Sequence, residues 1–479
     1  MKKLFILFII FILQASYINS AIIKVGLNQT YKKPSEVASI VNDGDTVDID
    51  AGIYEGDVCI WRKNNLLIRG IGGMAHLKAA GKYVEGKGIW VIKGNNTTVE
   101  YIEFSDATVP DQNGAGIRQE GINLTVRHCY FHDCEDGILA GANTNSNIII
   151  EFTEFARCGY GDGYSHNLYI GNVNMLTFRF CYSHHAKVGH NLKSRANNNY
   201  ILYNRIMDED DGNSSMLIDL PNGGLSYIIG NVLMKGTQAE NGNSITFGSE
   251  GLINPDKDIF IINNTMENRR STGTFASLNS QTNSAVIVNN LFIGNGKVYS
   301  GVADSSHNLF FNNAANAGIN NSSIFDYTLK KDSPAIDAGI DPGFGMGYKL
   351  IPSFEYKNNS DSISRIIENK IDIGALEYHS PNIIEECINN QFSVNIIPQP
   401  MGNNGKLIIN SLDAGFTRIT LWDFQGNYIG TVFENFIEAG STEIKFYLEK
   451  FTTSINSGIY FLRIDFNGKF YKKNIVIII

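Results

Sequence analysis

One window of the chain gathers the side chains that could act on an anion. From Gly163 to Met207 the sequence contains no Asp or Glu, although the whole chain carries a formal net charge of −9. A basic window in an acidic protein predicts a local surface for an anionic ligand. The window holds four of the nine histidines and five cations, namely His166, His184, His185, His190, Arg179, Lys187, Lys193, Arg195 and Arg205.

An internal repeat predicts how this window folds. No helical periodicity runs through it, and a six-residue apolar pattern returns every 24 to 33 residues instead. A unit of this length cannot bury its own apolar face, so the units must stack, and stacked short strands form a parallel β-helix. Neighbouring coils lie about 4.8 Å apart, so equivalent positions form columns. The repeats start at Val99, Val126, Ile150, Phe178, Leu202, Ile228, Ile261 and Ile287.

The sequence predicts which side chains occupy two of these columns. The fourth position of the repeat is Asn in three units, which predicts a ladder of side-chain amides through Asn231, Asn264 and Asn290. The second strand of each coil alternates inward apolar positions with outward positions. Its outward column is predicted to contain Arg118, Leu139, Tyr169, Lys193, Asp219 and Thr246.

The chemistry that this face could perform is proton abstraction from a uronate polymer, either as a β-elimination or as a C5 epimerisation. One cation neutralises the carboxylate, a base removes the C5 proton, and in elimination an acid protonates the leaving oxygen. We assign Lys193 as the base, Tyr169 as the candidate acid, and Arg195 and His190 as holders of substrate charge. Further contacts to the anionic polysaccharide are assigned to His166, which stacks on His190, and to Arg118, Asp219 and Asn191.

Alternatives stay open at this point. Asp219 could pair with Lys193 and keep it protonated, since a lysine needs cationic neighbours to act as a base at neutral pH. Tyr169 would then be the better base. Asn191 could be a turn residue only. The rival function is a non-catalytic surface protein that binds carbohydrate or adheres, with its binding spread over Tyr169, Arg118 and their neighbours.

Two smaller clusters carry predictions of their own. Asp208, Asp210 and Asp211 follow the basic window directly, and clustered carboxylates could hold Ca²⁺, the alternative being a solvated acidic turn. Cys134 and Cys158 each lie eight residues after the start of their repeat, on adjacent coils. The spacing of neighbouring rungs predicts either a disulfide or a buried thiol pair.

The two ends of the chain differ from the repeats. Lys2 and Lys3, an apolar run and small residues before Ala21 predict a secretory signal peptide over residues 1–20. Polar residues 381–391 predict a linker, and residues 392–479 alternate in short strands typical of a small β-sandwich. No later stretch is long and apolar enough for a transmembrane segment, and the net charge argues against nucleic-acid binding. We expect a monomer.

Several segments resemble known families. Residues 44–55, the repeats, and the segments 333–339 and 372–378 are similar to right-handed parallel β-helix proteins of the pectate-lyase-like superfamily. The resemblance covers residues 21–380 and implies an all-β chain, with a right-handed parallel β-helix followed by the small C-terminal β-sandwich. We expect a short helix over residues 35–41 to cover the open end.

The finer resemblances concern the predicted site and the C-terminus. Lys193 and Ser194 resemble the Lys-Ser motif of alginate lyases of the chondroitinase B type, in which the lysine is the base and an arginine on the next coil the acid. This sequence has Asp219 on the next coil, although Arg195 could reach the same space. Residues 457–464 and 472–477 resemble the type A sorting domain of the type IX secretion system, which implies Bacteroidetes-type export to the exterior or the cell surface.

Overall fold

The computed structural model describes residues 20–379, 392–398, 400–411, 414–423, 428–451, 455–466 and 469–478. The chain divides into two compact units, one ending at Tyr378 and the other starting at His379, beside the boundary expected after Ser380. The expected signal peptide, apart from Ser20, and the expected linker 381–391 lie outside the described residues.

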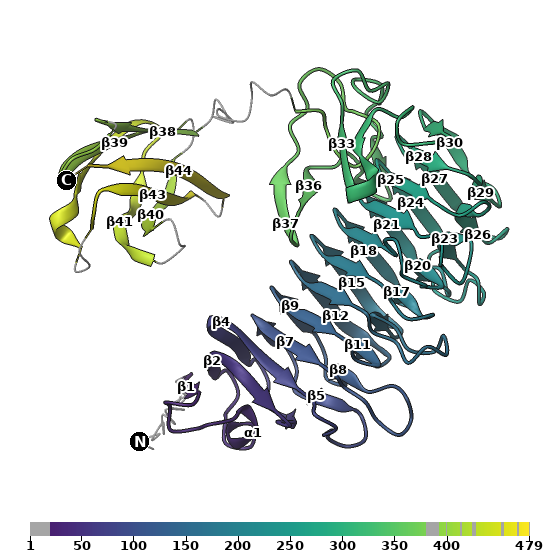
Figure 1. Cartoon of the computed structure of the whole chain (residues 1–479), viewed down its shortest axis with the longest axis horizontal. Coiled ribbons are helices and arrows are strands. Elements are labelled where there is room, and N and C mark those ends of the chain that lie inside the picture. Colours follow the sequence, from purple (N-terminus) through teal and green to yellow (C-terminus); the bar gives the residue numbers. More distant parts are fainter. Residues whose placement is uncertain are drawn as a thin grey trace, which may run out of the picture. The chain divides into compact units, whose positions relative to one another are not determined.

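The first unit is a parallel β-solenoid with three strand-lined faces, as the repeat predicted (Figure 1). The first two faces join through the long strands β2 (Thr46–Glu55) and β4 (Leu67–Lys78), which contribute to both. The first face also contains β1 (Ile22–Val25), β6 (Thr97–Glu100), β9 (Leu124–Arg127), β12 (Asn143–Glu151), β15 (Val173–Arg179), β18 (Asn198–Leu202), β21 (Leu225–Ile229), β24 (Asp258–Ile262), β27 (Ser284–Val288) and β30 (Asp304–Ser306).

The second and third faces complete each coil. The second contains β7 (Ile102–Ser105), β10 (Tyr130–His132), β13 (Glu154–Ala156), β16 (Tyr182–His184), β19 (Arg205–Met207), β22 (Val232–Lys235), β25 (Thr265–Asn268), β28 (Leu291–Gly294) and β31 (Leu309–Phe311). The third is a ten-stranded sheet of β3 (Cys59–Trp61), β5 (Gly88–Ile92), β8 (Ala115–Gln119), β11 (Asp136–Ala140), β14 (Leu168–Ile170), β17 (His190–Ser194), β20 (Met216–Leu220), β23 (Asn243–Phe247), β26 (Thr274–Leu278) and β29 (Lys297–Ser300).

The register of one repeat differs from the expectation. Phe178 pairs with Ile201 rather than with Leu202, so this repeat starts one residue earlier. The corrected alignment places Asn204 at the fourth position. The amide ladder is confirmed and is longer than expected, because side-chain amides donate along the whole series Asn204, Asn231, Asn264, Asn290 and Asn308 at 2.9–3.0 Å.

The chain bends inside each six-residue repeat rather than after it. The third residue of the repeat takes a left-handed backbone conformation, with φ between 51° and 58° at His128, Phe152, Phe180 and Tyr203. Few non-glycine residues adopt this conformation, and here it turns the chain from the first face to the second. The four rings stack along the corner with centroids 4.9–5.6 Å apart, which helps to hold the coils in register.

The ends of the solenoid are covered by short elements. The expected N-terminal helix is shorter than predicted, since α1 spans Pro34–Val37, and it buries Val37 and nearby Val41 in the core. At the other end, the segments 333–339 and 372–378 pack apolar side chains on the second face. Ala335, Ile373 and Ala375 share one buried cluster with Met234 and Leu291.

Short hairpins and a second unit complete the chain. The hairpins are β32 (Ile319–Asn321) with β33 (Asp326–Leu329), β34 (Phe344–Gly345) with β35 (Tyr348–Lys349), and β36 (Phe354–Lys357) with β37 (Asp361–Ser364). The second unit contains two antiparallel sheets around one core: β38 (Phe392–Ile397), β39 (Asn404–Ser411) and β42 (Gly440–Tyr447), and β40 (Gly415–Asp423), β41 (Tyr428–Ile437), β43 (Gly458–Phe466) and β44 (Lys469–Ile477). Within the described part of the chain, no helix has the length and apolar character needed to cross a bilayer.

Candidate functional site

The outward column predicted for the third face is present in the structure. Tyr169 on β14 pairs with Lys193 on β17, and Lys193 pairs with Asp219 on β20. The column continues from Asp219 to Thr246 on one side and from Tyr169 through Leu139 to Arg118 on the other. Strand alternation alone therefore placed these side chains correctly, because each strand of the solenoid pairs only with its neighbours.

Arg195 links the column to the turns that follow the strands. Its Nε donates to the phenol oxygen of Tyr169 at 3.0 Å, and its Nη1 donates to Oδ1 of Asn222 at 2.6 Å. Its Nη2 lies 2.7 Å from Oε2 of Glu250. Burial lowers the pKa of Arg195, but the bonds from Glu250 and Tyr169 outweigh it, and the net shift is upward. The guanidinium is therefore a fixed cation beside the Tyr169 oxygen.

Lys193 lies between two carboxylates. Its Nζ is 3.7 Å from Oδ2 of Asp219 and 3.3 Å from Oε1 of Glu250. The Lys193 side chain is 12% exposed and that of Asp219 is 5% exposed, so this contact is shielded from water. Two neighbouring anions stabilise the charged form of an amine. The pairing of Asp219 with Lys193, which the sequence left open as an alternative, is present, and it opposes a role for Lys193 as the base.

Asp219 and Glu250 have opposite environments. Burial raises the pKa of Asp219, although the hydroxyl groups of Thr246 and Ser249 donate to its Oδ1 and oppose the shift. Burial also raises the pKa of Glu250, but bonds from Arg195 and the charge of Lys193 outweigh it and lower the net value. Glu250 is thus an exposed, ionised carboxylate held by two cations, with 47% of its side chain accessible.

The two histidines of the site are neutral, which corrects one prediction. His166 and His190 stack as expected, with ring centroids 4.6 Å apart. Burial, reinforced by the charge of Lys193, lowers the pKa of His190 to about 3, and burial lowers that of His166 as well. His190 therefore cannot hold substrate charge as a cation near neutral pH. Its Nε2 lies 3.4 Å from Oδ2 of Asp219.

Two predicted substrate contacts lie away from the surface of the site. Asn191 is fully buried, where its side chain accepts from Asn167 at 3.0 Å and donates toward Asp208 and Ser214. It is a fully buried residue of β17, so its assignment as a substrate contact is wrong. Arg118 is partly buried on β8, two coils from Tyr169, and its Nε is buried without a hydrogen-bond partner.

The three aspartates assigned to calcium have separate partners. Asp208 is completely buried, 3.5 Å from the Lys235 ammonium, and also accepts from the Gly236 N–H and the Ser214 hydroxyl. Asp210 pairs with Arg269 at 2.7 Å, and Asp211 Oδ1 accepts from Nε2 of His185 at 2.9 Å. Among the described residues these three do not form a convergent group of ligands. They do not fit a shared Ca²⁺ ion.

The cysteine prediction is resolved in favour of its second alternative. Cys134 and Cys158 are both buried and both carry free thiols, so the assigned disulfide is not present. The two side chains are close enough to interact, and burial together with the Cys158 thiol raises the pKa of Cys134. The pair fills the core between adjacent coils.

The remaining cations of the acid-free window point elsewhere. Arg179 pairs with Glu151 at 2.5 Å on the first face, and Arg205 lies over the Tyr182 ring on the second face. Lys187 lies 3.9 Å from Asp133.

A hollow of about 570 Å³ also lies away from the site, lined by 14 residues that include Asp210, Glu267, Asn268, Arg269 and Arg270. Its Arg269 is already paired with both Asp210 and Glu267.

Sequence reasoning missed Glu250, Ser249 and Asn222. All three lie in turns that follow strands of the third face, and Glu250 reaches Arg195 from two coils away. The only signal in the sequence was the strand alternation, which, continued beyond β23, would place positions 248 and 250 on the same outward side as Thr246. A turn breaks that alternation, so the signal could not give the position of the Glu250 side chain.

Comparisons with known proteins identify the fold of the first unit. No protein-family model matches the sequence, and no curated protein matches it. The structure of pectate lyase Pel9A is similar at a TM-score of 0.53 and 14% identity, over 75% of this chain and 97% of that one. The chain is thus a right-handed parallel β-solenoid of the pectate lyase fold.

Two further structures match more weakly. The complex of XylC with xylose has 10% identity and a TM-score of 0.35, over 88% of this chain and all of that one. The alginate lyase AlyGC, of family PL6, has 12% identity and a TM-score of 0.34, over 77% of this chain and 58% of that one.

Proposed function

We propose that the first unit is a polysaccharide lyase, or a C5 epimerase that uses the same proton abstraction, acting on an anionic polymer that contains uronate. The observation that carries this proposal is the set Tyr169, Lys193 and Arg195 on one strand face, with the Arg195 guanidinium bonded to the Tyr169 oxygen at 3.0 Å. An open strand face can accept a long chain, and the pectate lyase fold of the unit supports the same class of substrate.

The contacts assign the roles differently from the Lys-Ser resemblance. Arg195 and Lys193 both hold the Glu250 carboxylate, in the arrangement that a uronate carboxylate would require. We infer that the substrate carboxylate replaces the Glu250 carboxylate, which lies on a turn with 47% of its side chain exposed. The two cations then neutralise the substrate carboxylate and acidify the C5 proton. Asp219 keeps its contact with the Lys193 ammonium on the buried side.

Tyr169 becomes the residue that moves the proton. Tyr169 is assigned to take the C5 proton because its oxygen is held by the Arg195 guanidinium on the face that also carries Lys193. In elimination the C4–O4 bond breaks as the C4–C5 double bond forms, and Tyr169 returns the proton to O4 on the same face of the sugar. In epimerisation a solvent water donates a proton to the opposite face of C5, Tyr169 releases the abstracted proton to solvent, and no bond of the chain is broken.

The test is a panel of alginate, pectate and glycosaminoglycans incubated with the full chain. Ultraviolet absorbance of new C4–C5 unsaturated ends reports a lyase, and incorporation of solvent deuterium at C5 without chain cleavage reports an epimerase. Tyr169→Phe and Arg195→Ala are each expected to lower turnover by about 10²–10⁴-fold. Lys187→Ala removes a cation from the same window but away from the site, and it is the matched control. Full activity in both site variants would refute the assignment.

The rival function is carbohydrate binding without catalysis. It predicts that a polyuronide binds while no unsaturated end and no deuterium appear. It also predicts that affinity falls by similar small factors when Tyr169, Arg118 or Lys193 is replaced. A loss concentrated in turnover, with binding retained in Tyr169→Phe, favours catalysis.

We also propose that residues 392–479 serve as a type IX secretion sorting domain and that residues 1–20 are a signal peptide. The C-terminal unit supports this assignment because it has its own core and two small antiparallel sheets. A chain truncated after Ser380 is expected to fold and to retain any activity, but to remain unexported in a host that has the type IX system. Export of the truncated chain would exclude the sorting role.

A further inference from the structure

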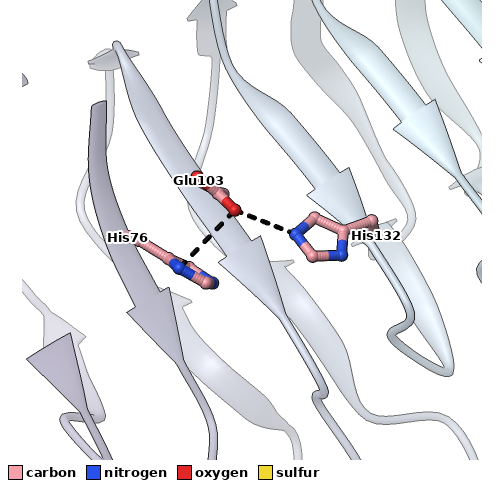
Figure 2. Close-up of side chains that lie close together, drawn as sticks. All are labelled: His76, Glu103 and His132. Atoms are coloured by element: carbon pink, nitrogen blue, oxygen red, sulfur yellow. Dashed lines mark hydrogen bonds and ion pairs between the residues drawn. The ribbon is translucent and has the colours of Figure 1, made fainter. Parts of the chain in front are cut away.

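A second cluster of polar side chains lies on the second face, several coils before the candidate active site. His76 on β4 pairs in register with Glu103 on β7, and His132 follows on β10. Figure 2 shows the Glu103 carboxylate between the two imidazole rings. Oε1 of Glu103 lies 3.5 Å from His76 Nδ1 and 3.0 Å from His132 Nε2. All three side chains are partly accessible, with 16–25% of each exposed.

The hydrogen bonds around His132 fix the orientation of its ring. Its Nδ1 lies 2.8 Å from Oδ2 of Asp133, and Asp133 is fixed by two bonds from Arg157 at 3.1 and 2.7 Å. Because Asp133 occupies the Nδ1 side, the opposite nitrogen, Nε2, is the atom that faces Glu103.

His76 has the same arrangement through a different partner. Its Nε2 lies 2.8 Å from the Ser105 hydroxyl oxygen, and that hydroxyl donates to Oδ2 of Asp106 at 3.2 Å. Since the serine proton goes to Asp106, the serine oxygen accepts from His76, and the proton of this ring is on Nε2. Its Nδ1 is then the atom that faces Glu103, 3.5 Å from Oε1.

One nitrogen of each imidazole and a carboxylate oxygen therefore converge on one small space, and these atoms all lie within 4.8 Å of one another. We propose that His76, Glu103 and His132 bind a divalent transition-metal ion of the zinc type. Zn²⁺ takes imidazole nitrogen and carboxylate oxygen at about 2.0–2.2 Å, which places tetrahedral ligand atoms roughly 3.3–3.5 Å apart. The ion would replace the direct contacts of the two rings to Glu103.

The surrounding bonds suit a metal site. Histidine ligands usually donate their second nitrogen to a carboxylate or another acceptor, which fixes the ring orientation. Asp133 and Ser105 do this for the two rings here. Hard ions such as Ca²⁺ prefer oxygen ligands, so two imidazoles select against calcium. Three protein ligands leave the fourth position to water, and the ion would join three successive coils.

The experiment is a calorimetric titration of the full chain, prepared without a histidine tag, with Zn²⁺ and separately with Ca²⁺. We expect one Zn²⁺ site per chain, a rise in melting temperature on binding, and no comparable Ca²⁺ binding. Substitution with Co²⁺ should give the visible absorption of a tetrahedral site. His132→Gln and Glu103→Gln should each weaken Zn²⁺ binding by about 100-fold or more, and Asp133→Asn by about 10–100-fold.

His184→Gln is the matched control, because His184 also lies on the second face and pairs with a glutamate, Glu154, at 3.2 Å, but is not part of the group. Its affinity for Zn²⁺ should equal that of the parent chain. Unfolding of the metal-free variants shows whether each substitution leaves the fold intact. Absence of stoichiometric Zn²⁺ binding, or equal binding by His132→Gln, would overturn the proposal.

Discussion

Replacing Lys193 by Ala separates the structural from the functional role of this residue. From the sequence alone, an exposed lysine would be removed without loss of stability. In the structure its ammonium is the nearest cation to Asp219, whose side chain is 5% exposed. Breaking a buried ion pair costs about 3–5 kcal/mol, but Thr246 and Ser249 still donate to Asp219. We expect the free energy of unfolding to fall by about 2 kcal/mol.

The loss should depend on pH in a defined direction. The penalty comes from an unpaired anion, so it is largest where Asp219 is ionised and disappears as the pH falls and Asp219 takes a proton. Denaturant unfolding of the parent chain and the variant at several pH values measures it. Turnover on a responsive polyuronide should fall by about 10²–10³-fold, because one of the two cations that hold the carboxylate is gone.

A double variant completes this test. Lys193→Ala with Asp219→Asn removes both charges, so stability should return while turnover stays low. Unchanged stability of Lys193→Ala would contradict the buried pairing with Asp219. Recovery of turnover in the double variant would show that Lys193 only neutralises Asp219 and does not contact the substrate.

Two further predictions concern stability. Burial lowers the pKa of His190 in the folded chain to about 3. The stability that the neutral ring contributes is therefore present above the ordinary pKa of about 6.5 and is lost as the pH falls below it, by up to about 1.4 kcal/mol per pH unit. His190→Gln should make the free energy of unfolding fall less steeply between about pH 6.5 and 4, and an unchanged slope would contradict the neutral, buried state of His190. Asn264→Ala should lower the free energy of unfolding by about 2–5 kcal/mol, because the Asn264 side chain makes four hydrogen bonds in the ladder. Denaturant unfolding measures this loss, and a value below about 1 kcal/mol would show that the ladder contributes little to stability.

The C-terminal architecture could be anticipated from alternating strands and a change of composition, and the solenoid from its repeat. Errors arose where the repeat is locally ambiguous. Leu202 and Ile201 are both apolar, so the pattern did not distinguish them, and only the pairing of Phe178 with Ile201 revealed that Asn204 joins the ladder. The left-handed bend at the third position had a signal in residue type only in the later repeats, where Gly230, Asn263 and Asn289 occupy it. In the earlier repeats histidine, phenylalanine and tyrosine occupy the position and give no such signal.

The charges of the site residues could not be predicted without the tertiary structure. The window from Gly163 to Met207 has no acid in the sequence, yet Asp219 and Glu250 reach its cations from later coils. Burial, which a pattern of residue types does not report, makes His190 neutral and places Asn191 in the interior. The cluster of His76, Glu103 and His132 was missed for a related reason, because its members come from three coils and two different columns.

The sequence by itself therefore determined which residues share a column. In a solenoid each strand pairs only with the strands before and after it, so a local repeat specifies position along the whole stack. Tyr169, Lys193 and Asp219 follow this rule. What only the tertiary structure decided is which side chains from turns and other columns meet them, since turn conformations and long flexible side chains are not periodic. In this site those contacts bring Asp219 and Glu250 to the cations Lys193 and Arg195.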